Sequence, residues 1–99
     1  MASAKRAMRI DAADNVAVML QDVIAGEEIA IDGESETIIA PMDVNMPHKI
    51  ACRDIAEGEQ ILKYGCQIGS ASRPIKRGEH VHTHNIRFET NDDIDEKRY

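Results

Sequence analysis

Short aliphatic segments, separated by glycine, proline and charged residues, recur along the whole chain. Their alternation of apolar and polar positions and their β-branched residues are typical of strands. Gly or Pro interrupts every candidate helix before it completes three turns. The pattern predicts strands at residues 16–20, 28–31, 37–40, 49–52, 60–64 and 81–88, with exposed loops at residues 32–36 and 41–48. We therefore expect an all-β domain, a small folded-over sheet or partial barrel.

One sequence pattern occurs three times: an aliphatic residue, two further residues, Gly-Glu, any residue and a second aliphatic residue. Its glycines are Gly26, Gly58 and Gly78. Glycine has no Cβ and readily adopts the positive φ that a tight turn requires, while the two aliphatic residues can anchor the turn and begin the next strand. The pattern predicts the same turn three times, with glycines that serve the backbone rather than a ligand.

Composition narrows the class of protein. A chain of 99 residues that is 42% hydrophobic can form one small domain with a limited core. A net charge of -6 and only three aromatic residues provide neither a basic groove nor a stacking surface, so nucleic acid is not an expected partner. We expect no membrane span and, because the N-terminus lacks the apolar segment of a secretory signal, a cytoplasmic location. Cys52 and Cys66 are then expected to be free thiols rather than a disulfide or a zinc site.

Three alternating histidines carry the strongest chemical signal, in the run Gly78-Glu79-His80-Val81-His82-Thr83-His84-Asn85. If this run is a strand, the three imidazoles share one face at a repeat of about 6.5 to 7 Å. Neutral imidazole binds Zn, Fe, Mn or Ni at about 2.0 to 2.2 Å, so a His-x-His pair is a good fragment of a metal site. The alternative is an edge strand whose histidines bond backbone or carboxylate groups. Three such rings followed by Asn favour a functional face.

A catalytic metal also needs a third protein ligand and an open position. His80, His48 and Glu89 are the candidates for that ligand, provided the fold brings one of them to the His-x-His pair. His48 and Lys49 form a second polar group at the end of a predicted loop. A lysine there suits the binding of a carboxylate, although an ordinary basic residue that covers apolar surface explains it equally well.

Several motifs, in order, match a known family: Asp14-Asn15-Val16-Ala17-Val18-Met19-Leu20, His48-Lys49-Ile50-Ala51, Asp54-Ile55-Ala56-Glu57-Gly58-Glu59, Ile61-Leu62-Lys63-Tyr64-Gly65, Ile68-Gly69 and the histidine run. From about residue 9 to 88, the chain resembles the N-terminal domain of the altronate and galactarate dehydratase family. The resemblance implies the β-clip fold of the SAF superfamily, all-β, over residues 9–88. Residues 1–8 are then an N-terminal extension and residues 89–99 a charged tail.

The resemblance also implies a function. In that family the small domain pairs with a larger catalytic domain that eliminates water from a sugar acid, assisted by a divalent metal, commonly Fe²⁺. This chain resembles the separate small subunit of such a lyase, and the small subunit of sulfolactate sulfo-lyase is a related possibility. The family pattern implies catalytic roles for His48 and Lys49, metal binding by His80, His82 and His84, and substrate binding by Lys49, Lys63 and Asn85. The family usually has glycine where Pro47 stands, so this loop departs from the pattern.

Other interpretations stay open. A SAF-like module that binds a carbohydrate or a protein without catalysis is one, and a stand-alone cupin enzyme is a weak one, because only the centre of the cupin motif is present. The edge strands of a small β domain can pair, so a homodimer is also possible. The choice among altronate, galactarate, sulfolactate and other acids depends on a pocket expected mostly in the partner. Tyr64 is expected to fill the core.

Overall fold

The computed structural model describes residues 3–88, and in that range the chain consists of strands, turns and loops. The strands are β1 (Lys5–Met8), β2 (Val16–Met19), β3 (Glu28–Ile31), β4 (Thr37–Ile39), β5 (Lys49–Ala51), β6 (Gln60–Lys63), β7 (Cys66–Ala71), β8 (His80–Val81) and β9 (Ile86–Arg87). Among these residues there is no helix long and apolar enough to cross a membrane. The expected all-β class is confirmed.

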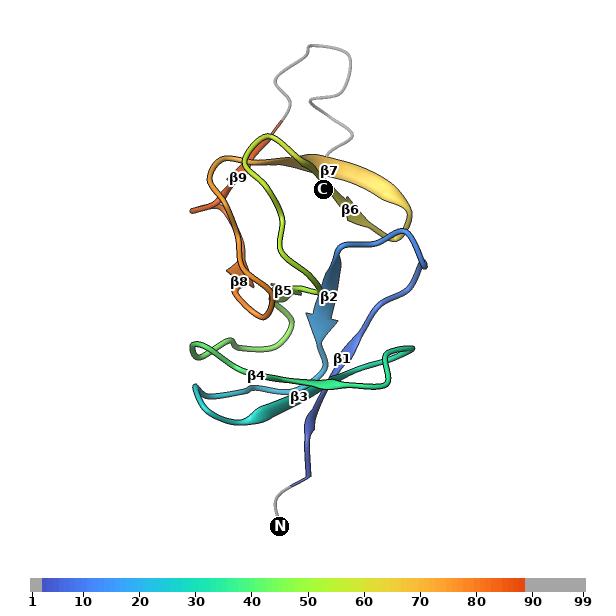
Figure 1. Ribbon diagram of the computed structural model, residues 1–99, viewed down its shortest axis with the longest axis vertical. Helices are drawn as coiled ribbons and strands as arrows, with labels where there is room; N and C mark the ends of the chain where they lie inside the picture. The colour runs from blue at the N-terminus through green and yellow to red at the C-terminus, as the bar shows by residue number, and fades with distance from the viewer. Residues whose placement is uncertain (1–2, 89–99) are drawn as a thin grey trace.

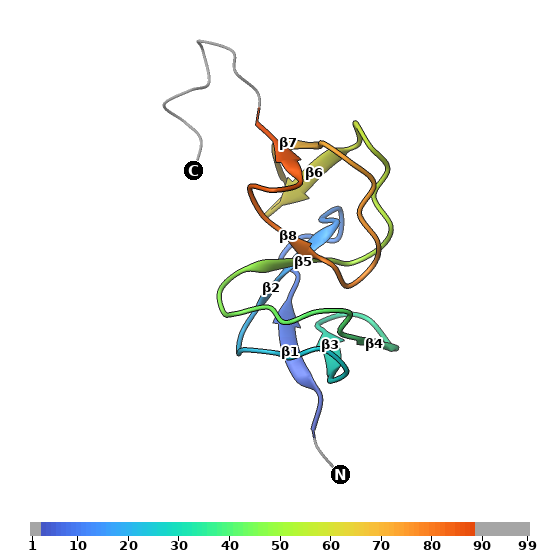
Figure 2. The ribbon, with the colours of Figure 1, turned by 90° about the vertical axis from the view of Figure 1, so that its left-hand side faces the viewer.

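The strands form two sheets. The larger has the order β4-β3-β1-β2-β5-β8, in which β1 and β3 are parallel and the other neighbours antiparallel. The smaller is antiparallel, with the order β6-β7-β9. In both views β5 and β8 lie between the β6–β7 hairpin at one end and β3 and β4 at the other (Figures 1 and 2). They therefore occupy the middle of the molecule.

Two apolar clusters form the core, and β2 and β5 contribute to both. Ala17 and Ile50 belong to the cluster on the side of β1, β3 and β4, whereas Val16 and Ala51 belong to the cluster on the side of β6, β7 and β9. Successive side chains of a strand point to opposite faces, so two paired strands can cover a core on each side. The two halves are thus joined through β2 and β5.

The stretch treated above as an N-terminal extension contains β1. This strand pairs with β2 on one side and with β3 on the other, and Ala7 is fully buried. The domain therefore includes residues from Lys5 onward, and a boundary at residue 9 would remove a central strand. The predicted tail, residues 89–99, lies outside the described residues.

The prediction of one continuous strand over residues 81–88 is wrong, because two short strands lie in this stretch. The chain leaves the larger sheet after Val81, turns through residues 82–85 and enters the smaller sheet as β9 at Ile86. The histidine run therefore crosses from one sheet to the other rather than lying flat along one strand. β7, which the apolar pattern did not predict, pairs with both β6 and β9.

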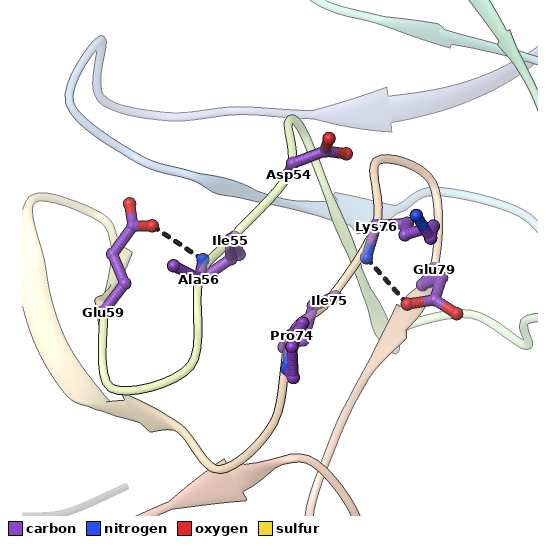
Figure 3. Close-up of a pocket in the computed structure, with 8 residues that line it drawn as sticks. All are labelled: Asp54, Ile55, Ala56, Glu59, Pro74, Ile75, Lys76 and Glu79. Carbon is purple, nitrogen blue, oxygen red and sulfur yellow. Dashed lines mark hydrogen bonds between the residues drawn. The ribbon is translucent and has the colours of Figure 1, made fainter.

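The three predicted turns are confirmed. Their glycines have positive φ values of 93°, 85° and 90° at Gly26, Gly58 and Gly78. In each turn the glutamate side chain accepts a hydrogen bond from the backbone N–H three residues earlier. Figure 3 shows two of these bonds, from Ala56 to Glu59 at 2.9 Å and from Lys76 to Glu79 at 2.7 Å. Each glycine turn is closed by its own carboxylate.

Another turn with the same order of bridge, turn and strand begins at residue 43, in the stretch predicted as a loop, and leads into β5. Numbered in chain order, the turns that contain Gly26, Pro47, Gly58 and Gly78 are the first, second, third and fourth. Pro47 takes the place of the glycine, in a cis bond with Met46, and His48 takes the place of the glutamate. The N–H of His48 donates to the C=O of Asn45 at 2.8 Å, as the glutamate N–H does in the glycine turns. The Gly-Glu pattern does not include this copy because both of its residues are replaced.

The four turns pack in two pairs, through a bridge between Val23 and Val44 and another between Ile55 and Ile75. Within a pair, an aspartate of one turn accepts a hydrogen bond from the backbone of the other. Both directions occur in the first pair, at 2.9 Å each. In the second pair Asp54 accepts from Arg77, and Pro74 occupies the position of the other aspartate. This pairing holds the second turn in place beneath β5.

Candidate metal centre

Three histidines that are far apart in the sequence meet at the middle of the molecule. His48 ends the second turn, directly before β5, and His80 begins β8. β5 and β8 are antiparallel neighbours, with Ile50 opposite His80, so this pairing brings His48 to a residue 32 positions later. His82 follows β8 in the turn that crosses to the smaller sheet.

The three imidazoles are close and half-buried. Nδ1 of His48 and Nε2 of His80 lie 2.7 Å apart in a hydrogen bond. The ring centroids are 4.9 Å apart for His48 and His80, 4.4 Å for His48 and His82, and 5.6 Å for His80 and His82. One nitrogen from each ring lies within 4.8 Å of the other two. This group is called the histidine triad below.

The triad fits a divalent metal ion. Two nitrogens bound to one ion at about 2.0 to 2.1 Å stand about 3 Å apart, so small side-chain rotations convert the 2.7 Å hydrogen bond into a ligand pair. Three imidazole nitrogens suit Zn, Fe, Ni or Cu, and a three-ligand set leaves a coordination position open. Of the candidates for a third ligand, the fold brings His48 to the triad, whereas Glu89 lies outside the described residues.

The environment of His80 and His82 favours their neutral form. Burial lowers the pKa of His80, and the nearby His48 lowers it further. Burial, followed by His48, also lowers the pKa of His82. Loss of solvation disfavours the charged ring, and a second positive ring disfavours it again. Both residues are therefore held in the form that binds metals.

His84 lies next to His80 but is not among the three residues whose ligand nitrogens converge. Its ring centroid is 5.2 Å from that of His80, and its side chain is exposed. Its backbone C=O accepts a hydrogen bond from Arg73 at 2.9 Å. The sequence grouped His84 with His80 and His82 on the assumption of one continuous strand, whereas the turn at residues 82–85 changes the direction of the side chains. The structure groups His48 with them instead.

Lys49 lies beside the triad, and a second lysine, Lys63, lies near Lys49. Lys49 is half-buried on β5, and burial together with the positive charge of Lys63 lowers its pKa. The charge of Lys49 in turn contributes to the lowered pKa values of His80 and His82. No ion pair joins either lysine to a carboxylate within residues 3–88. Lys49, next to three imidazoles and near the charge of Lys63, forms a region that attracts an anion.

Asn85, predicted to bind substrate, is buried, with 4% of its surface exposed. Its Oδ1 accepts a hydrogen bond from the N–H of His82 at 2.9 Å, and its Nδ2 donates to the C=O of His80 at 2.8 Å. Both ends of the amide are therefore bonded to the backbone of the histidine run. No local sequence pattern predicts this contact, because it depends on the turn between β8 and β9.

Tyr64, expected in the core, is exposed at the tip of the β6–β7 hairpin, and that prediction is wrong. Its φ is 57°, and 53% of its surface is exposed. The buried carboxylate of Asp14 accepts hydrogen bonds from the N–H of Tyr64 at 2.9 Å and of Gly65 at 2.7 Å. Nζ of Lys63 lies 4.8 Å from the centroid of the tyrosine ring. A buried aspartate thus holds the hairpin tip in its left-handed conformation.

Two further features are separate from the triad. A hollow of about 390 Å³ lies between the third and fourth turns, but its carboxylates Glu59 and Glu79 already bond the backbone (Figure 3). Cys52 and Cys66 are free thiols, as expected. Burial, and then the charge of Glu34, raises the pKa of Cys52 to about 11, so this thiol stays protonated and unreactive.

Known proteins resemble this chain over almost its whole length. It is 44% identical over 92 residues to altronate dehydratase of Escherichia coli, and 40% identical over 88 residues to that of Bacillus subtilis. These matches cover 93% and 89% of this chain but only 18% and 17% of the relatives. The chain thus spans less than a fifth of the length of these two enzymes.

The chain also matches smaller proteins. It is 50% identical over 40 residues to (2R)-sulfolactate sulfo-lyase subunit alpha of Chromohalobacter salexigens, covering 40% of this chain and 43% of that subunit. It is 30% identical over 59 residues to the same subunit of Paracoccus pantotrophus, covering 60% of this chain and 88% of that subunit. The altronate/galactarate dehydratase SAF domain matches residues 5–89, which include β1, all four turns and the histidine triad. With this extent of agreement, the chain belongs to the altronate/galactarate dehydratase SAF domain family.

Proposed function

We propose that this chain is the small, metal-binding subunit of a carbon–oxygen lyase that dehydrates a sugar acid such as altronate or galactarate, together with a large catalytic subunit. The observation that carries the proposal is the convergence of His48, His80 and His82 in a SAF domain of this family. The similarity to altronate dehydratase supports the reaction, and the similarity to a protein named subunit alpha supports the division into subunits.

The residue types suit the chemistry. Removing water β to a carboxylate needs a base for the α proton, an acid or Lewis acid for the leaving hydroxyl, and positive charge for the developing enediolate. In this proposal the triad holds Fe²⁺ or another divalent ion, which supplies Lewis acidity when bound. Lys49 binds the carboxylate and Lys63 assists it, because Lys49 lies near the triad, Lys63 lies near Lys49, and neither has an ion pair with a carboxylate in the described part of the chain.

The large subunit is required for two reasons. The triad is only half-buried on this chain, and elimination chemistry is favoured where water is excluded. Within residues 3–88 the converging group consists of histidines alone, with no carboxylate that could act as a base. A partner that covers His48 and His82 would supply both the shielding and the missing groups, and we place this complex in the cytoplasm.

A sulfo-lyase is the second candidate. The match to the Paracoccus pantotrophus subunit covers 88% of that protein and 60% of this chain, so most of that subunit corresponds to part of this domain. Elimination of sulfite also needs a cationic site for an acidic substrate, and the two lysines fit that need as well. The two reactions differ in leaving group, which is the property to test.

The test is affinity purification of the chain from the cytoplasmic fraction of its native cells, followed by mass spectrometry, metal analysis and assays with altronate, galactarate and sulfolactate. We expect a large dehydratase-like subunit, a divalent metal and loss of water from a sugar acid. Exchange of both His80 and His82 for alanine should abolish that activity while the complex still forms. Release of sulfite would favour the second candidate. Recovery of the chain alone and without metal would refute both and favour a non-catalytic binding module.

A further inference from the structure

We propose that Asn85 is the positioning residue of the histidine triad: its amide holds the backbone of His80 and His82 so that both imidazoles are directed at His48. The inference rests on the proposed metal site for its purpose, but it concerns an arrangement that can be measured without metal. Its basis is the pair of hydrogen bonds from the buried amide, to His82 N–H at 2.9 Å and to His80 C=O at 2.8 Å.

The position of β8 explains why such a residue is needed. β8 is the last strand of the larger sheet and only two residues long. In an antiparallel pair, alternate residues direct their backbone groups away from the neighbouring strand, and on an edge strand these groups have no partner. Residues 80 and 82 are two apart, and the Asn85 amide bonds one backbone group of each. The side chain takes the place of a missing strand.

The same side chain also holds the crossing between the sheets. After His82 the chain must turn to reach β9, and the N–H groups of Asn85 and Ile86 both donate to the C=O of His82, at 3.0 and 3.1 Å. Asn85 is thus bonded to His82 through its backbone and through its side chain. The direction of the His82 imidazole depends on this short closed turn, whose far end is fixed next to β7 by the hydrogen bond from the N–H of Ser72 to the C=O of Asn85 at 3.0 Å.

A second asparagine shows that this is a structural device of the fold. Asn15 is also buried; its Oδ1 accepts from the N–H of Leu62 and its Nδ2 donates to the C=O of Gln60, both at 2.8 Å. Gln60 and Leu62 follow Gly58 as His80 and His82 follow Gly78, so the two asparagines bond equivalent residues of the third and fourth turns. Only at the fourth turn are the bonded residues histidines of the triad.

This equivalence provides a matched control. Asn85→Ala and Asn15→Ala each remove one buried amide and two backbone hydrogen bonds, so both should lower the melting temperature of the 99-residue chain. Only Asn85→Ala should change the triad. Asn85→Asp is a second variant for the case in which the alanine variant does not fold, since it keeps the shape and the oxygen that accepts from His82 but lacks the donor to His80.

The experiment has two measurements on the full chain. The first is NMR of the chain labelled with ¹⁵N-histidine, without metal, which reports the tautomers and the hydrogen bond between His48 and His80. The second is titration with Co²⁺, followed by calorimetry and by the visible absorption of the bound ion. For Asn85→Ala we expect loss of the His48–His80 bond and Co²⁺ binding weaker by about tenfold or more, with a changed absorption spectrum. Asn15→Ala should keep the wild-type values of both.

The outcomes separate this inference from the proposed function. If Asn85→Ala and Asn85→Asp keep the wild-type imidazole spectrum, or if Asn15→Ala disturbs it equally, the positioning role is refuted. If the wild-type chain does not bind Co²⁺, the proposed metal site fails, but the imidazole spectra still decide the role of Asn85. Altered imidazoles in the Asn85 variants alone support the inference.

Discussion

The second turn and the three glycine turns share the same order of bridge, turn and strand but use their side chains differently. In the glycine turns the glutamate accepts a hydrogen bond from its own turn, as Glu59 does from Ala56. In the second turn His48 stands at that position, and its ring contacts His80 on another strand instead. The repeated turns form the scaffold, and the replacement of glutamate by His48 in the second turn makes one side chain available for chemistry.

The polar side chains of these regions also differ in whether they stabilise the fold or are available to the site. Polar side chains such as Glu59, Asp54 and Asp14 are bonded to backbone N–H groups and support the fold. His48 and Lys49 make no such bond, and they lie where β5 meets β8. Groups that stabilise the fold and groups that serve the site are therefore neighbours in the sequence but separate in their contacts.

The largest effect is expected from His48→Ala, which leaves the second turn, like the others, without a metal-binding side chain. Loss of one of three ligands should weaken Co²⁺ or Fe²⁺ binding by about 100-fold or more, with little change in melting temperature because the ring is half-buried. Calorimetric titration of the chain measures this. His84→Ala should have far less effect; an equal loss would support the grouping expected from the sequence rather than the one in the structure.

Asp14→Asn should destabilise the hairpin tip and leave the triad intact. Burial raises the pKa of Asp14, but hydrogen bonds from Gly65, Asp11 and Tyr64 outweigh it, so the pKa lies below 3.8 in the folded state. The charged form is thus favoured by folding, and its contribution is present above pH 3.8 and lost as the pH falls through the lowered value. The variant should lose about 1 to 3 kcal/mol at neutral pH.

Urea denaturation at pH 7 and near pH 3 measures this contribution. The difference between wild type and Asp14→Asn should shrink at the lower pH, because the unfolded wild-type chain takes up a proton at Asp14 below pH 3.8 more readily than the folded chain does. A difference that is independent of pH would show that the charge of Asp14 does not hold the hairpin tip.

A smaller effect is expected from Glu59→Ala in the third turn. It removes the hydrogen bond to the N–H of Ala56, which should lower the free energy of unfolding by about 1 kcal/mol. Co²⁺ affinity should not change, since the third turn carries no ligand. Chemical denaturation and a metal titration on the same sample test the separation. A marked loss of affinity would mean that the turns are coupled to the triad.

The smallest effect is expected from Pro47→Gly, which gives the second turn the glycine of the others. The new N–H can donate to a neighbouring strand, as that of Gly26 does to Ala40 at 2.8 Å, whereas the more flexible unfolded chain opposes this gain by about 0.4 to 1 kcal/mol. Stability should change by less than about 1 kcal/mol, and metal affinity should be kept because His48 remains. Thermal unfolding and Co²⁺ titration check both; a lost triad would show that Pro47 itself directs His48.

Local chemistry explains what could be predicted. Each glycine turn is specified within eight residues, so Gly26, Gly58 and Gly78 could be read directly from the sequence. The strands next to these turns followed from short apolar runs. β1 was missed because Lys5–Met8 is short and half polar, and only its pairing on both sides shows that it is a central strand.

The sequence by itself determined the all-β class, the repeated turns and the presence of histidines able to bind a metal, because these depend on residue type and on spacings of a few residues. The tertiary structure alone decided that His48 rather than His84 completes the triad, that Asn85 bonds the backbone, and that Tyr64 is exposed. Each of these depends on a contact between distant parts of the chain or on the path between the sheets: the register of β5 against β8, the crossing between the two sheets, and the hydrogen bonds of Asp14 to the hairpin tip. Such pairings are selected by the packing of two cores, which no short stretch of sequence specifies.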